Sequence, residues 1–199
     1  MASPRLPWEV IERIIAHSGD ESETLLRFSL TCRDLRPRAL CLLVGVVYLK
    51  RRVNIFDFCD FLAAKPHLKP FVRSVAMNPN NFAPFPLLSI LPDLADLTFI
   101  GYDLHAVITV LNRSSLICCK RFGVHIQALH LSDLSFPTYL EFARLLLAFT
   151  NIRHLFCSDV VIKSEGNRAP LDVVKPRLSD RLHLLTVSLL ASYPTVRGS

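Results

Sequence analysis

The side chains that could perform chemistry are scattered along the sequence. Serine, histidine and aspartate occur together in His130-Leu131-Ser132-Asp133, but neighbours along a strand point to alternate faces and cannot form a nucleophile, base and orienting group. His154-x-x-Cys157 resembles half of a zinc site, but no second pair completes four ligands. The glycines form neither a Gly-x-Ser-x-Gly elbow nor a phosphate-binding loop. We therefore predict a protein that is not an enzyme, with no catalytic residue, no metal and no cofactor.

The composition indicates a folded protein with a basic surface. The chain has 199 residues, of which 51% are hydrophobic and 20% charged, which fits one large domain or two small ones around a packed core. The formal net charge of +6 would suit a nucleic-acid binder. However, the basic clusters at residues 50–52 and 120–121 are short, far apart and lack interleaved aromatic residues. We therefore favour a solvated basic surface over nucleic-acid binding.

The cysteines and the first residues of the sequence indicate the cellular compartment of the protein. No two of the six cysteines form a Cys-x-x-Cys pair, so we expect them to be reduced and buried. The start of the sequence does not resemble a signal peptide, and the most apolar run, residues 40–49, is shorter than the roughly 20 residues of a membrane helix. The sequence predicts an intracellular protein, cytoplasmic or nuclear, that makes no contact with a membrane.

The first forty residues read as three short helices. A first helix is expected to begin at Pro7, which suits the first helical position, and to end near Ser18, with apolar residues at helical spacing. Asp20 is expected to cap a second helix, with Glu23 completing a variant of the capping box. A third helix is expected over residues 33–40. A unit this small rarely buries an adequate core alone, so its apolar surplus needs another surface.

From residue 42 the pattern changes to strands and helices in turn. A strand is expected over residues 42–49, a helix over 54–64, a strand over 71–77 and a later helix over 139–149. Short strand cores recur at residues 74–77, 96–99, 128–131, 154–157 and 184–187. Because each unit is too small to cover its own apolar face, we expect an irregular solenoid of stacked units. A globular α/β domain with a parallel sheet is the alternative.

The strand cores align with one another by their second residues, which are Val75, Leu97, Leu129, Leu155 and Leu185. This alignment places His130 opposite Phe156. The last units suggest an incomplete or truncated array whose final strand edge is exposed. Asp103, Asp133 and Asp159 follow three of the cores, and they are either substrate contacts or turn residues that satisfy local backbone groups.

Two motifs near the start carry a resemblance to a known family. They are Leu6-Pro7-x-Glu9-Val10-x-x-x-Ile14-Ile15 and Leu25-Leu26-x-x-Ser29-Leu30-x-Cys32-Arg33-x-Leu35. Together they resemble the F-box, the helical module by which substrate receptors join SCF-type ubiquitin ligases. Leu35 stands where the family often has Trp. The remainder of the chain is similar to fungal F-box proteins in which leucine-rich-repeat-like units follow the F-box.

The resemblance implies a non-catalytic receptor with an F-box over residues 1–41 and an irregular leucine-rich-repeat-like domain over 42–199. The F-box would bind a Skp-family adaptor, which bridges to a cullin, and the repeats would hold an unidentified protein substrate. The implied adaptor-binding residues are Leu6, Pro7, Glu9, Val10, Ile14, Leu25, Leu26, Leu30, Cys32 and Leu35. Each apolar one among them could serve as internal core or as contact. A repeat-type scaffold that never enters a ligase, with the N-terminal helices as its cap, is the alternative.

Overall fold

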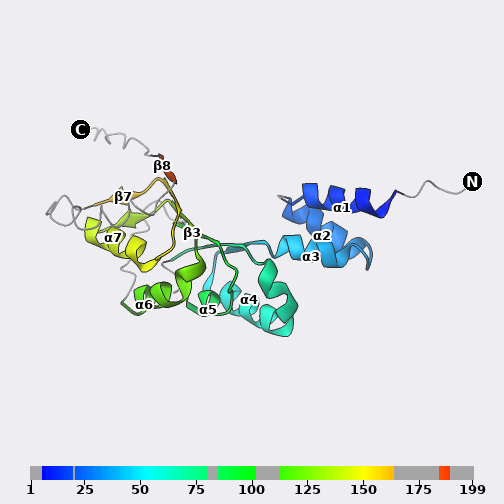
Figure 1. The fold of residues 1–199 in the computed structure, drawn as a ribbon, viewed down its shortest axis with the longest axis horizontal. Helices are drawn as coiled ribbons and strands as arrows, with labels where there is room; N and C mark the ends of the chain where they lie inside the picture. Colours follow the sequence, from blue (N-terminus) through cyan, green and yellow to red (C-terminus); the bar gives the residue numbers. More distant parts are fainter. Residues whose placement is uncertain (1–5, 20, 80–84, 102–112, 164–183, 189–199) are drawn as a thin grey trace, which may run out of the picture.

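The computed structural model describes residues 6–19, 21–79, 85–101, 113–163 and 184–188. Asp20, the expected cap of the second helix, and Asp103, a candidate contact residue, lie outside the described residues. Within them, the chain is a mixed α/β protein built on a parallel sheet, with a helical module at one end (Figure 1).

The helical module comprises α1 (Trp8–His17), α2 (Ser22–Thr31) and α3 (Arg36–Leu43). Both α1 and α2 pack against α3. Pro37 lies in the first turn of α3, where the missing N–H of proline costs no helical hydrogen bond. The buried hydrophobic core of the module is small and consists of Ile15, Leu25 and Ala39, with Ile11, Phe28, Leu35, Leu42 and Leu43 packed against it.

The strand expected from residue 42 begins later than the pattern predicted. Leu42 and Leu43 belong to α3, and the helical hydrogen bonding continues as the Val44 N–H donates to the Leu40 carbonyl oxygen (3.0 Å). The strand β1 covers Val46–Leu49. The physical reason is tertiary: Leu42 and Leu43 pack on the core of the module, and this packing outweighs the strand propensity of the apolar run.

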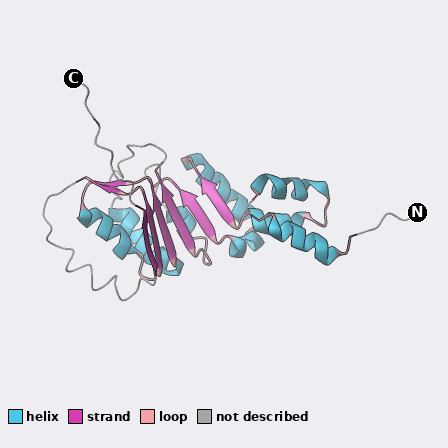
Figure 2. Cartoon of the chain, turned by 90° about the horizontal axis from the view of Figure 1, so that it is seen from above, coloured by secondary structure: helices cyan, strands magenta, loops and turns pink. Residues whose placement is uncertain are grey.

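The main sheet contains β1, β2 (Ser74–Met77), β3 (Asp96–Ile100), β4 (Ala128–Ser132), β6 (His154–Ser158) and β8 (Leu184–Ser188). The strands are parallel and lie side by side in the order in which they occur in the chain (Figure 2). Val75 pairs with Leu97, and the same row continues through Leu129, Leu155 and Leu185. The register predicted from the strand cores is therefore confirmed.

Helices lie between the strands of the main sheet from β1 to β6. They are α4 (Arg52–Ala64), the 3₁₀ segment η1 (Pro66–Phe71), α5 (Phe85–Leu88), α6 (Arg113–Phe122), the 3₁₀ segment η2 (Gly123–His125) and α7 (Tyr139–Ala148). The labelled helices α4 to α7 lie on the same side of the main sheet (Figure 1). A strand was expected from residue 71, but η1 extends through Phe71 and β2 begins at Ser74. The Val72 N–H donates back to the Lys69 carbonyl oxygen at 3.2 Å, which closes the 3₁₀ segment and keeps this N–H from a strand neighbour.

The two faces of the main sheet differ in burial. In β3, Leu97 and Phe99 are buried, whereas Asp96, Thr98 and Ile100 are half-buried, the alternation that a strand imposes on its side chains. On the half-buried face, His130 lies opposite Phe156 and their rings stack with centroids 4.3 Å apart. The predicted juxtaposition of these two residues is therefore confirmed. Removal of the imidazole from water lowers the pKa of His130, an effect that nearby Asp96 partly offsets.

Successive units repeat the same hydrogen bonds just before each strand. The Gly45 carbonyl oxygen accepts from the N–H groups of Arg73 and Ser74, at 3.0 and 2.9 Å. The carbonyl oxygens of Arg73, Ala95 and Gln127 each accept two N–H groups from the next unit in the same way. Four contacts of the same kind thus join five neighbouring units, and the residues directly before the strands form a row along the sheet edge.

A second recurring feature follows the strands. Asp133 and Asp159 have φ angles of 55° and 56°, in the left-handed region that aspartate tolerates in turns. Both therefore serve as turn residues, one of the two roles that the sequence allowed. Two short strands come next, β5 (Ser135–Phe136) and β7 (Val161–Ile162), which pair in a second parallel sheet. Gly101 approaches the same turn so closely that a Cβ would lie 1.9 Å from the Asp133 carbonyl oxygen.

Candidate functional site

The helical module exposes more large apolar side chains than it buries. Ile15 and Leu25 are its large buried residues, and Ala39 joins them. By contrast, six large hydrophobic residues of α1, α2 and the segment before α1 are exposed: Leu6 (61%), Trp8 (42%), Val10 (39%), Ile14 (45%), Leu26 (50%) and Leu30 (76%). Single exposed hydrophobic residues are common on proteins, but a concentration of them marks an interaction surface.

Helical geometry explains how α1 is apolar on two sides. Val10 and Ile14 are four residues apart and both exposed, so they form one outward stripe. Ile11 and Ile15 are also four residues apart, and they face the core of the module. The large apolar residues of α1 therefore outnumber those needed for packing against α3, and three of the five, Trp8, Val10 and Ile14, are exposed.

The same division occurs in α2 between two adjacent leucines. Leu25 is 1% exposed and lies in the core, whereas Leu26 is 50% exposed. Leu30, four residues after Leu26, extends the outward stripe and is still more exposed. Each of the two helices thus carries one apolar stripe for internal packing and one that is uncovered among the described residues.

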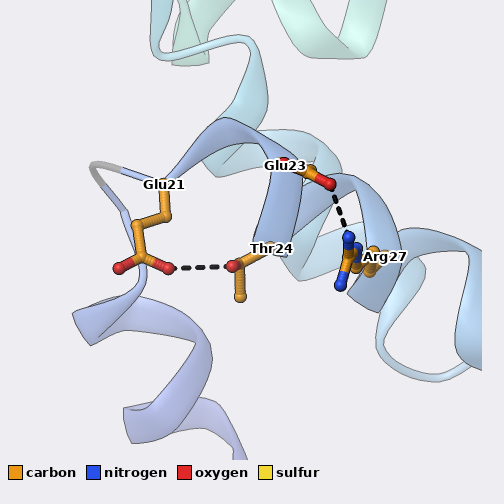
Figure 3. Close-up of polar contacts among 4 residues, drawn as sticks. All are labelled: Glu21, Glu23, Thr24 and Arg27. Carbon is orange, nitrogen blue, oxygen red and sulfur yellow. Dashed lines mark hydrogen bonds and ion pairs between the residues drawn. The ribbon is translucent and has the colours of Figure 1, made fainter.

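Polar contacts in the first turns of α2 and at the residue before it stabilise the start of the helix (Figure 3). The Thr24 hydroxyl donates to a Glu21 carboxylate oxygen at 2.8 Å, and the Arg27 guanidinium pairs with Glu23 one turn earlier. Because the side chains of Arg27 and Glu23 are about three-quarters exposed, this ion pair contributes well under about 1 kcal/mol. These contacts help to define the start of α2 and leave Leu26 exposed.

The structure assigns positions to the ten residues singled out from the sequence. Eight are exposed: Leu6, Pro7, Glu9, Val10, Ile14, Leu26, Leu30 and Cys32. Leu25 is buried in the module core, and Leu35 is half-buried against it. Trp8 was not among the ten, although it is the only tryptophan of the chain and is exposed between Pro7 and Glu9. Its position inside the first motif was the signal that could have identified it.

The thiols differ in accessibility. All six cysteines are free; Cys119 and Cys157 are buried, three are half-buried and Cys32 is exposed. Burial raises the pKa of Cys119 to about 12 and that of Cys157 to about 11. The prediction of buried cysteines is wrong for Cys32, because it follows the last turn of α2 in an extended conformation on the surface.

The candidate metal pair is separated by the fold. His154 is half-buried on one face of β6, and Cys157, three residues later, is buried on the other. Across the ranges that the structure describes, no three metal-ligating side chains gather, and no helix is both long and apolar enough to span a membrane.

The exposed stripes of the module are suited to non-covalent docking. Apolar side chains on α1 and α2 would contribute contact area once water is excluded, and Glu9 and Arg33, both exposed, could make polar contacts at the rim. Comparisons of the chain with protein-family models, with curated proteins and with solved structures give no match.

Proposed function

We propose that the chain is a non-catalytic substrate receptor of an SCF-type E3 ubiquitin ligase. Its N-terminal module acts as an F-box that binds a Skp-family adaptor and, through it, a cullin. Residues 42–199 form an irregular leucine-rich-repeat-like solenoid that holds a protein substrate. The adaptor interaction would operate in the cytoplasm or the nucleus.

The observation that carries this proposal is that most apolar residues of the two F-box-like motifs are exposed on the surface of the module. Leu6, Val10, Ile14, Leu26 and Leu30 are motif residues, and each is at least 39% exposed. A residue that served packing alone would be buried. Among the leucines of the two motifs, Leu25 alone is buried. Clustered apolar side chains on rigid helices are typical of the energetic centre of a protein interface.

The solenoid part of the proposal is supported by the regular repetition of contacts. The strands pair in chain order without a crossover between distant strands. The units of β1, β2, β3 and β4 each contact the next unit through the carbonyl oxygen of the residue directly before the strand. Contact restricted to neighbouring units is the physical character of a repeat array. The division at residue 41 stays a prediction, since α3 continues to Leu43.

A pull-down with a purified Skp-family adaptor tests the function. The wild-type chain should capture the adaptor, and a variant carrying Leu6→Ala with Pro7→Ser should lose capture while remaining folded, because both residues are exposed. Leu26→Asp should have the same effect. Val53→Asp is the matched control, because Val53 is 51% exposed on α4, outside the module, and this variant should still capture the adaptor.

One observation favours a second candidate, in which the module caps a repeat-type scaffold with no ligase role. The last turn of α3 joins the larger hydrophobic core that the main sheet forms with its helices, since Cys41 packs against that core and Val44 follows as one of its buried members. A cap predicts that the wild-type chain captures no adaptor and that Leu26→Asp lowers the melting temperature or the solubility. That combination of results would replace the ligase proposal.

A further inference from the structure

A polar cleft lies at the edge of the main sheet where the strands begin. Its volume is about 660 Å³, and its lining includes Arg73, Asp93, His125, Gln127, Asn151 and Arg153. Sites for ligands commonly have volumes of about 300–1,000 Å³. The cleft is separate from the exposed stripes of α1 and α2, because none of its lining residues belongs to the module.

The recurring hydrogen bonds of the solenoid place four of the lining residues in a row. Arg73, Ala95, Gln127 and Arg153 directly precede β2, β3, β4 and β6. Their N–H groups all bond to the preceding unit, and three of their carbonyl oxygens bond to the next one. The backbone of the row is thus engaged, so a ligand must be recognised chiefly by side chains. Neighbouring strands are about 4.8 Å apart, which separates the two arginine positions by about 14 Å.

An arginine stands at each end of this row, Arg73 before β2 and Arg153 before β6. Both are exposed, and in the described part of the chain neither guanidinium takes part in an ion pair or a side-chain hydrogen bond. Asp93 also lines the cleft but forms no ion pair with either arginine. A guanidinium offers several donors in a plane, an arrangement that matches a carboxylate.

The remaining lining suits a peptide backbone. The Asn151 amide donates to the Val124 carbonyl oxygen at 2.6 Å, which fixes the orientation of this carboxamide beside the row. The exposed carboxamide of Gln127 and the carboxylate of Asp93 can bond to peptide C=O and N–H groups. The presence of Asp93 makes the cleft less favourable for a compact multivalent anion than for separated carboxylates on a polar chain.

We propose that this cleft binds an extended acidic segment of a partner protein, laid across the beginnings of the strands. One carboxylate pairs with Arg73 and a second with Arg153. At about 3.4 Å per residue, an extended peptide spans the 14 Å between them in about four residues. Identification of this partner with a ligase substrate rests on the proposed function, whereas binding of the peptide itself does not.

Fluorescence anisotropy with the purified full chain tests the assignment. The probe is a labelled glycine and serine peptide that carries two glutamates about four residues apart, and the reference is the same peptide with glutamine in both places. Arg73→Gln and Arg153→Gln are each expected to weaken binding of the glutamate peptide about five-fold, and the double variant about 25-fold, as for exposed charge pairs. The matched control is Arg144→Gln, which removes an exposed arginine of α7 outside the cleft.

Preference for the glutamate peptide, reduced by the cleft variants and unchanged by Arg144→Gln, would support the assignment. Equal binding of both peptides, absence of binding, or equal effects of all three arginine variants would overturn it. Thermal melts of each variant confirm folding. Because no adaptor is present, failure of this assay leaves the adaptor pull-down unaffected, and the two proposals fail separately.

Discussion

Truncation of two adjacent leucines should separate packing from docking in α2. Leu25 is 1% exposed and is one of three residues in the core of the module. Leu25→Ala removes its transfer free energy and leaves a cavity, which together cost about 2–5 kcal/mol. Leu26 is 50% exposed, so Leu26→Ala forfeits half of the roughly 1.5–3 kcal/mol of a fully buried side chain and leaves no cavity. The expected cost is about 1 kcal/mol.

Trp8 provides a local assay for these two variants. It is the only tryptophan of the chain, and α1, which carries it, packs against α3 of the module. Its fluorescence during urea unfolding therefore reports on the module separately from the sheet. The midpoint should fall strongly for Leu25→Ala and slightly for Leu26→Ala, with similar slopes. In the adaptor pull-down, Leu26→Ala should weaken capture at a urea concentration where the module is still folded.

Two results would refute this reasoning. If Leu26→Ala lowers the urea midpoint as much as Leu25→Ala, the outward stripe of α2 is covered in solution and is unavailable to a partner. If Leu25→Ala costs less than about 1 kcal/mol, the three-residue core does not hold the helices together.

Three further predictions concern the sheet region and the thiols. Because burial lowers the pKa of His130, the folded state binds fewer protons at this site than the unfolded state, and stability should fall as the pH drops below about 6.5. Urea titrations across this range should show a smaller decline for His130→Phe, which keeps a stacking ring but cannot ionise; an unchanged decline would exclude His130 as its source. Gly101→Ala should lower stability by about 3 kcal/mol in thermal melts, because its Cβ would collide with the Asp133 backbone; a stable variant would show that this approach is looser. A thiol reagent at neutral pH should label Cys32 rapidly and leave Cys119, whose pKa is raised to about 12, unlabelled until unfolding; rapid labelling of both thiols in the native protein would contradict the burial of Cys119.

The strand cores were predictable because their signal is local. Short apolar runs mark each strand. Alignment of the second residues of these runs predicted which residues pair across the sheet, from Val75 in β2 to Leu185 in β8. The same alignment placed His130 beside Phe156. In a parallel stack of similar units, residues at equivalent positions in successive units pair with one another. The position of a residue within its unit therefore predicts its partner on the neighbouring strand.

Features that depend on packing between elements could not be predicted from the residues. The apolar run at 42–49 suited a strand, but its first residues extend α3 because the core of the module lies beside them. Leu25 and Leu26 are identical in type and adjacent in sequence, and only the placement of α2 against α3 decides that one is buried and the other exposed.

The sequence by itself determined the alternation of helices and strands, the register of the parallel sheet and the concentration of apolar residues in the first three helices, because each of these follows from local periodicity. Tertiary structure decided which of those apolar residues face outward and brought Arg73 and Arg153 to the rim of one cleft. These residues are far apart in the chain, and no local pattern links them. Their proximity arises from the pairing of β2, β3, β4 and β6 in one sheet.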